Sequence, residues 1–384
     1  MSAAVRVTPG TAKKSQSEFG LINLLKAGAA QLIVLHHLAF YGPMADRARP
    51  LWPELIDWLG DSARIAVQVF LVIGGFLAAK SLAPTGQPGH SHPLAAIGRR
   101  YAKLAPPFIA ATLLAVVASN WAGTWMTHDS ISPPPTLDQL GAHALLLHGV
   151  LGFDSVSAGA WYVAIDFQLY ALLVLVLWTG GRIAGNHGSR WLMPVAVALG
   201  VALSLLHFNL DGDWDNWAPY FFGSYGLGVM AWWAGDRRRH PAVVALLVLM
   251  VVVPALVALT LDFRSRIALA LLVAGVLVLF GRSTTTSTGP VWSAINGLGR
   301  ISYAVFLVHF AVCLLVNAAF TRFVSPEPEP QAFGMLVAWA ASLWAGAAFH
   351  RWVEVPLGRM VQLVTGQVTV PSRAVQAERF VSVR

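Results

Sequence analysis

Apolar segments of about twenty residues recur along most of the chain, and short polar stretches separate them. A segment of that length crosses the hydrocarbon core of a bilayer as a single α-helix. We expect a first such helix directly after residue 20, with further spans at 62–83, 103–121, 159–179, 191–208, 217–235, 241–260, 266–281, 301–320 and 331–355. The pattern predicts an all-α fold, a polytopic integral membrane bundle of about ten transmembrane helices.

The composition agrees with a membrane protein. Of the 384 residues, 56% are apolar and 11% are charged, whereas soluble proteins carry roughly 25% charged residues. This excludes an ordinary water-soluble enzyme and a disordered chain. The single cysteine, Cys313, excludes an intramolecular disulfide framework and a cysteine-based zinc cluster. A net charge of +8 would suggest nucleic acid as partner of a soluble protein. In a membrane protein its distribution matters more, and we expect no nucleic-acid partner.

The distribution of Lys and Arg predicts the topology. Ten crossings place both termini on one side, and the loops richest in Lys and Arg face the cytoplasm. With both termini inside, about 20 of the 26 Lys and Arg residues lie inside. We therefore expect a cytoplasmic tail at 1–20, a transmembrane domain at 21–356 and a second cytoplasmic tail at 357–384. The few outer cations are Arg47, Arg49, Arg64, Arg264, Arg266 and Arg322.

The longest outer loop, about 122–158, carries three consecutive prolines at 133–135. Proline runs favour extended backbone, so this segment is expected to form a lid or rim. Within it, the apolar stretch 138–151 is too short to span and holds His143 and His148, which is typical of an interfacial or re-entrant piece.

Ionisable residues within the apolar segments are candidates for a functional site, because charge is costly in hydrocarbon. In the first segment Lys26 and His37 lie eleven residues apart, so they share one helix face about 16 Å apart along the axis, and His36 points about 100° away. His37 is either a functional imidazole deep in the membrane or a packing histidine bonded to a neighbouring helix.

A cationic pair opens the third segment. Arg100 and Lys103 lie three residues apart and therefore share a helix face. Such a pair on the inner side could hold a phosphate-rich ligand. Plain anchoring by the positive-inside rule explains it equally well.

A carboxylate stands in the fourth segment, where Tyr162, Asp166 and Tyr170 share a face and Trp161 lies beside it. A buried carboxylate needs a partner, and a histidine is a natural one. A structural salt bridge between helices is the alternative.

Two later segments carry polar residues at helical spacing. Ser302 and His309 are seven residues apart and share a face. Glu354 can pair with Arg351 or His350, and Pro356 is expected to mark a helix boundary. The histidines of the inner loops lack the spacing of a helical zinc motif, so no metal is expected.

Taken together, these segments resemble the acyltransferase family 3 integral-membrane proteins, which O-acylate sugars and cell-surface polysaccharides. The resemblance extends over roughly residues 18–356. It departs from the family at three positions, where Gly74 replaces a serine, Lys103 an arginine and Asp166 a glutamate. The segments that carry it are Lys26 to His37, Val69 to Phe76, Arg100 to Lys103, Trp161 to Asp166, Ser302-Tyr303 to His309 and Glu354-Val355-Pro356.

The resemblance implies an acyltransferase of the bacterial inner membrane with acyl-coenzyme A, in particular acetyl-CoA, as donor. The donor phosphates would lie near Arg100 and Lys103, with help from Lys26. His37 would act as general base or accept the acyl group transiently, and Asp166 would orient it. The acceptor, a glycan or lipid-linked sugar, would enter from outside beneath the proline-rich loop, and membrane lipids would surround the bundle. Residues expected to contact substrate are Trp161, Tyr162, Ser302 and His309.

Other functions remain open from the residues alone. A multi-pass transporter with an intramembrane His/Asp proton relay would also need buried ionisable groups. A protein that moves an acyl group or lipid-linked sugar across the membrane without attaching it is another possibility, as is a receptor or scaffold.

Overall fold

A computed structural model describes residues 20–87, 92–184, 190–283 and 289–364, and every regular element in these ranges is helical. Four short helices, α2 (Pro43–Ala48), α3 (Pro53–Asp61), α6 (Leu137–Ala144) and α14 (Val355–Val364), accompany the long ones. The long helices are α1 (Gly20–Phe40), α4 (Val67–Leu82), α5 (Pro93–Ala122), α7 (Ala160–Ala184), α8 (Leu192–Leu206), α9 (Ala218–Ala234), α10 (Pro241–Leu261), α11 (Ser265–Phe280), α12 (Pro290–Phe323) and α13 (Pro328–Phe349).

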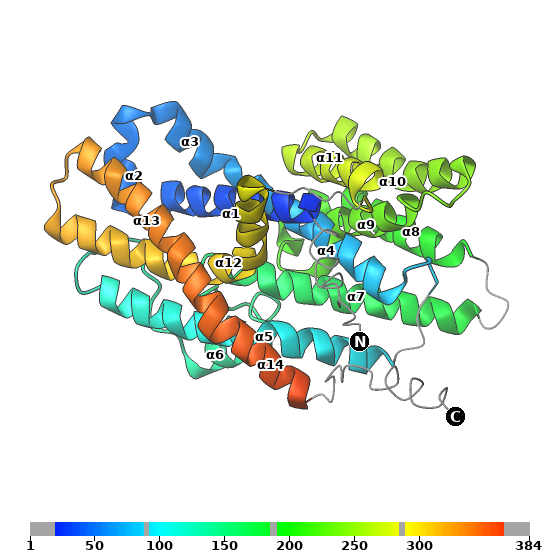
Figure 1. Cartoon of the computed structure of the whole chain (residues 1–384), viewed down its shortest axis with the longest axis horizontal. Helices are drawn as coiled ribbons and strands as arrows, with labels where there is room; N and C mark the ends of the chain where they lie inside the picture. The colour runs from blue at the N-terminus through cyan, green and yellow to red at the C-terminus, as the bar shows by residue number, and fades with distance from the viewer. Residues whose placement is uncertain (1–19, 88–91, 185–189, 284–288, 365–384) are drawn as a thin grey trace, which may run out of the picture.

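Eight helical segments in the described ranges are long and apolar enough to cross a membrane. The expected count of about ten is therefore not confirmed. The spans expected at 217–235 and 266–281 correspond to α9 and α11, which have 17 and 16 residues. Most long helices run side by side along the horizontal axis of Figure 1, and α13 with α14 crosses them diagonally.

Two helices begin about ten residues earlier than hydropathy predicts. The spans expected at 103–121 and 301–320 are α5 and α12, which start at Pro93 and Pro290. Proline suits the first turn of a helix because its missing N–H has no intrahelical acceptor there. Arg100 and Lys103 therefore both lie within α5, as their shared helix face requires.

Helix α9 lies at the centre of one half of the bundle. Every residue of α9 except Pro219 is buried, and its neighbours are α4, α7, α8, α10 and α11. Its closest approach is to α4: a Cβ on Gly75 would overlap the Tyr225 carbonyl oxygen, and a Cβ on Gly228 would overlap the Val72 carbonyl oxygen. Small residues let two membrane helices pack backbone against backbone, and here each helix supplies one glycine.

The other half of the bundle is built on α12, which packs against α1, α5 and α13. Helix α1 lies between α12 and α4, so it joins the two halves. This arrangement brings the C-terminal half of α1 against the middle of α12, where each helix carries a buried histidine, His37 and His309.

The chain does not leave the helix at Pro356 as expected. A π-helical turn, His350–Glu354, connects α13 to α14, which continues to Val364. Proline clashes with the carbonyl four residues earlier, and the wider π turn displaces that carbonyl. Glu354 pairs with His350 at 2.8 Å within this turn. The expected C-terminal tail therefore begins with an ordered helix; its remainder, and the N-terminal tail before Gly20, lie outside the described residues.

The loop between α5 and α7 is folded. Its three prolines are not helical, and α6 follows them. His143 donates from Nδ1 to the Gln139 carbonyl (2.8 Å) and accepts the Val156 N–H at Nε2 (3.1 Å), which closes the loop on itself. The His148 ring stacks on His143 with centroids 4.0 Å apart. Burial and the neighbouring His143 lower the pKa of His148 to about 3, so this stack is uncharged at neutral pH.

Candidate functional site

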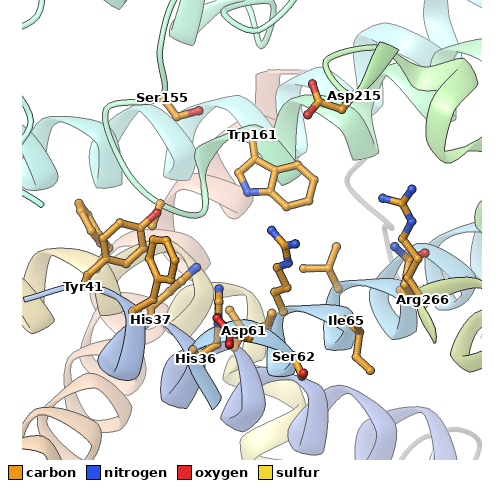
Figure 2. Close-up of a pocket in the computed structure, with 18 of the residues that line it drawn as sticks. His36, His37, Tyr41, Asp61, Ser62, Ile65, Ser155, Trp161, Asp215 and Arg266 are labelled. Atoms are coloured by element: carbon orange, nitrogen blue, oxygen red, sulfur yellow. The ribbon is translucent and has the colours of Figure 1, made fainter. Parts of the chain in front are cut away.

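A cavity of about 1080 Å³ opens at the end of the bundle where the α1–α4, α5–α7, α8–α9 and α10–α11 connections meet. His36 and His37 of α1 and Asp61 of α3 lie on one wall, and Trp161 and Asp215 face them from the other (Figure 2). The cavity is therefore lined by imidazole, carboxylate and aromatic groups together.

His37 is held by a second histidine. The His309 Nδ1 donates to the carbonyl oxygens of Val305 (3.1 Å) and Phe306 (2.9 Å), so in the neutral ring Nε2 carries the lone pair. The His37 Nδ1 lies 2.6 Å from that Nε2 and must donate to it. The proton of neutral His37 is thereby fixed on Nδ1, and its Nε2 is left with a lone pair.

The exposure of the two rings assigns their roles. His309 is 0% exposed, whereas His37 is 7% exposed and lines the cavity. The Nε2 of His37, which has no hydrogen-bond partner among the described contacts, is therefore the nitrogen of this pair that a ligand in the cavity can reach. An imidazole with a fixed tautomer and a free Nε2 can accept a proton from a hydroxyl group, as a general base does. His309, which the sequence placed among the substrate contacts, is not part of the described lining and contacts His37 instead.

We expect replacement of His309 by leucine to lower kcat/KM about 10- to 100-fold, because the His37 Nδ1–H then loses its acceptor and the tautomer is no longer fixed. Glutamine at position 309 offers a carbonyl acceptor and should restore part of the activity. Steady-state kinetics over a pH series, with thermal stability measured alongside, tests this. Equal activity of the leucine variant and the wild type would refute the positioning role.

His36 also lines the cavity, although α1 turns it away from His37. Its Nδ1 lies 2.9 Å from the Leu59 carbonyl oxygen, to which it donates. The two rings have centroids 5.0 Å apart. The cavity therefore covers two adjacent faces of the end of α1, and His36 is tied to α3 through Leu59.

Asp166 does not take the partner that we expected. It accepts a hydrogen bond from the Arg100 guanidinium, which also lies 5.3 Å from the centre of the Tyr170 ring. Asp166 is 6% exposed, and a buried carboxylate is stable only beside a compensating charge, which Arg100 always supplies. The interhelical salt bridge is thus the correct alternative. Two expectations change: the partner of His37 is His309, and the Arg100 guanidinium already holds a carboxylate.

Three aromatic rings lie between the two polar centres, and we call them the aromatic plug: Phe70, Tyr162 and Phe306. Their centroids are 6.0 Å (Phe70 to Tyr162), 6.2 Å (Phe70 to Phe306) and 5.2 Å (Tyr162 to Phe306) apart. Phe306 lines the cavity and packs beside His309. Tyr162 lies one turn before Asp166 on α7. Tyr162, expected at the substrate, is not part of the described lining and packs on Phe306, which is.

The remaining expected substrate contacts differ from each other. Trp161 lines the cavity, and its ring packs on Phe221 with centroids 5.7 Å apart. Ser302 is outside the described lining: it is 1% exposed, and its hydroxyl donates to the Gly299 carbonyl at 3.0 Å. A serine inside a helix commonly bonds to the preceding turn in this way, and the sequence spacing does not reveal it.

Lys26 and Lys103 meet near the start of α14. They interact electrostatically with each other and with Glu354. Lys103 is exposed and Lys26 is half-buried. The third expected donor-binding cation, Arg100, is already paired with Asp166. Lys26 and Lys103 are therefore the two that can still bind an anionic ligand.

Sequence reasoning gave no role to several polar residues of the cavity. Three arginines line it, and all three are among the few cations that charge counting assigned to the outer side. Arg264 is bound to Asn209 and to Asp262. Arginines in outer loops, where the positive-inside rule predicts few cations, could therefore have indicated this cavity from the sequence. The lining residues missed are Asp61, Arg64, Gln68, Asp129, Asp215, Arg264 and Arg266.

The family model of acyltransferase family 3, described as an acyltransferase domain, matches residues 20–349. A search of curated proteins and of solved structures finds no significant match.

Proposed function

The chain belongs to acyltransferase family 3, and from that premise we propose that it transfers an acyl group from acyl-coenzyme A to a hydroxyl group of a glycan. It is an integral membrane protein with eight membrane-crossing candidates among its described helices. The observation that carries the proposal is the His37–His309 pair beside a cavity of about 1080 Å³. That volume is slightly above the range of about 300–1,000 Å³ common for ligand pockets, so the cavity has room for a ligand at least as large as a sugar unit.

The chemistry needs one base and one leaving group. The Nε2 of His37 removes the proton from an acceptor hydroxyl as its oxygen attacks the thioester carbonyl carbon. A C–O bond forms, and the C–S bond then breaks to release the coenzyme A thiolate. The proton on His37 passes to that sulfur, so the imidazole is neutral again. During the cycle His309 keeps Nδ1 protonated and holds the ring in place.

The two substrates would reach the base from opposite ends of the bundle. We assign the donor to the end that carries Lys26 and Lys103, because two neighbouring ammonium groups suit the phosphates of coenzyme A. We assign the acceptor to the cavity, where the Trp161 ring offers a stacking surface and Asp61 and Asp215 can accept hydrogen bonds from hydroxyl groups. In a bacterial inner membrane with cytoplasmic termini, the donor end faces the cytoplasm.

Replacing Lys103 with alanine should raise the KM for acetyl-CoA about tenfold and leave the acceptor KM unchanged, because one charge-assisted contact to phosphate is lost. Arg359→Ala is the matched control, since Arg359 is an exposed cation of nearby α14. An equal effect in both variants would indicate a general surface charge rather than a donor site, and a rise in the acceptor KM alone would overturn the assignment.

Transfer of label from radioactive acetyl-CoA tests the function itself. The purified protein in proteoliposomes is supplied with labelled acetyl-CoA on one side and candidate glycans on the other. We expect a covalent, alkali-labile label on the glycan. A coenzyme A thiol released without labelled glycan, or no reaction with any glycan tried, would count against the proposal.

A proton-coupled transporter is less well supported. Its relay would need Asp166 and His37 to exchange a proton. The described contacts instead join Asp166 to Arg100 and His37 to His309, and the aromatic plug lies between the two pairs.

A further inference from the structure

A buried tyrosine hydroxyl in the middle of the bundle is without a hydrogen bond. Tyr225 of α9 is 0% exposed, and among the described residues its Oη has no hydrogen-bond partner. The Nε of Arg100 is also buried and unpaired within the same ranges. Unpaired donors inside a protein cost free energy, because the water that once bonded them is not replaced. Two such donors, one on α5 and one on α9, therefore call for an acceptor.

The two donors belong to one cluster around the Arg100–Asp166 pair. Tyr225 interacts electrostatically with both members of the pair. A Cβ on Gly74 would lie 3.2 Å from the Asp166 Oδ1 and 3.2 Å from the Tyr225 Cε2, so the carboxylate and the tyrosine ring meet at this glycine. Helices α4, α5, α7 and α9 thus each contribute one residue to the cluster.

The charge of the cluster selects the kind of acceptor. Asp166 neutralises Arg100, so an anion at this point would be opposed by the carboxylate and would gain little from the guanidinium. A neutral oxygen with lone pairs, such as the carbonyl of an amide or a thioester, satisfies an O–H and an N–H donor without adding charge. Lys103 lies one helical turn from Arg100 on α5, so a ligand with phosphates at Lys103 can place its neutral arm beside the cluster.

We propose that the Tyr225 hydroxyl, together with Arg100 Nε, binds a carbonyl oxygen of the acyl donor. This inference rests on the proposed function, because the donor is a coenzyme A thioester. Such a donor has amide carbonyls along its pantetheine arm and one thioester carbonyl at its end. Tyr225 is then a donor-binding residue whose hydroxyl is satisfied only when the substrate is bound.

The test is Tyr225→Phe, which removes only the hydroxyl. Binding of acetyl-CoA and of free coenzyme A is measured by titration calorimetry, and thermal stability is measured without ligand. We expect affinity for acetyl-CoA to fall about fivefold, as for one lost neutral hydrogen bond. Thermal stability should be equal to that of the wild type or higher, because the hydroxyl bonds to no protein group in the free enzyme. An equal loss for both ligands assigns an amide carbonyl of the pantetheine arm. A loss for acetyl-CoA alone would place the thioester carbonyl across the aromatic plug from His37 and would overturn the role proposed for that histidine.

Tyr101→Phe is the matched control. The Tyr101 hydroxyl donates to the Ala144 carbonyl at 2.8 Å, so its loss should lower stability and leave donor affinity unchanged. Unchanged affinity of Tyr225→Phe for both ligands would overturn the inference, as would a stability loss like that of Tyr101→Phe, which would indicate a partner such as a trapped water. Failure of the wild type to bind acetyl-CoA would count against the proposed donor instead.

Discussion

His37→Ala is expected to lower kcat/KM about 10²- to 10⁴-fold, the range that a positioned general base contributes. Within the His37–His309 pair, the Nε2 of His37 is the ring nitrogen that faces the cavity, and alanine at position 37 removes it. The fold should persist, since His37 lies at the cavity wall and its ring is 7% exposed rather than part of the apolar core. Labelled acetyl-CoA transfer measures the loss, and a monodisperse elution profile verifies folding.

His36→Ala serves as the control for this experiment. It removes a neighbouring imidazole that lines the same cavity but donates to the Leu59 carbonyl. Its loss of activity should stay below about tenfold. Should His36→Ala abolish transfer while His37→Ala retains it, the base would be His36 and the mechanism above would be wrong.

The largest expected effect on stability comes from Gly75→Ala. The added Cβ would occupy the position of the Tyr225 carbonyl oxygen, and backbone cannot rotate away as a side chain can. Helices α4 and α9 would have to separate along their whole contact, which also carries the reciprocal approach at Gly228. We expect a loss above about 3 kcal/mol, beyond the usual range for overpacking in a core that can adjust.

Gly28→Ala is the matched control on α1, because nothing lies within 4 Å of the position that its Cβ would take. Alanine is the better helix former by about 1 kcal/mol, so this variant should be neutral or slightly more stable. Thermal unfolding in detergent compares the two proteins. Similar melting temperatures for both variants would mean that α4 and α9 are not in direct backbone contact.

The class of the fold follows from local sequence. The apolar segments are long enough to cross a membrane, and unpaired backbone groups cost free energy in lipid. A helix pairs all of these groups within one segment, so these segments are expected to be helical. Helix starts at Pro93 and Pro290 were missed because arginines, at 99 and 100 in α5 and at 300 in α12, separate the first turns from the long apolar run, and hydropathy windows end at such residues. The sequence predicts that the last helix ends at Pro356, whereas the helix continues beyond it. The difference arises because a π turn depends on a hydrogen-bond pattern that no residue pattern specifies.

The candidate site is less readable from sequence, because its pairs join residues far apart in the chain. Helical spacing alone indicates that His37 shares a face with Lys26 and that His309 shares a face with Ser302. That they meet depends on the packing of α1 against α12, across 272 positions. Asp166 had two plausible partners in the sequence, and only the approach of α5 to α7 decides for Arg100.

The aromatic plug also bears on the energy supply of the cell. A membrane protein that holds a polar cavity at one end and a buried ion pair deeper in its bundle must not become a leak for protons or salt. Phe70 and Phe306 have no ionisable atoms, and the Tyr162 ring packs against both of them. Ions therefore meet a low-dielectric barrier between the cavity and the Arg100–Asp166 pair. Under the proposed function, an acyl group, being small and uncharged, would cross this barrier at a far lower desolvation cost than an ion and without discharging the transmembrane gradient.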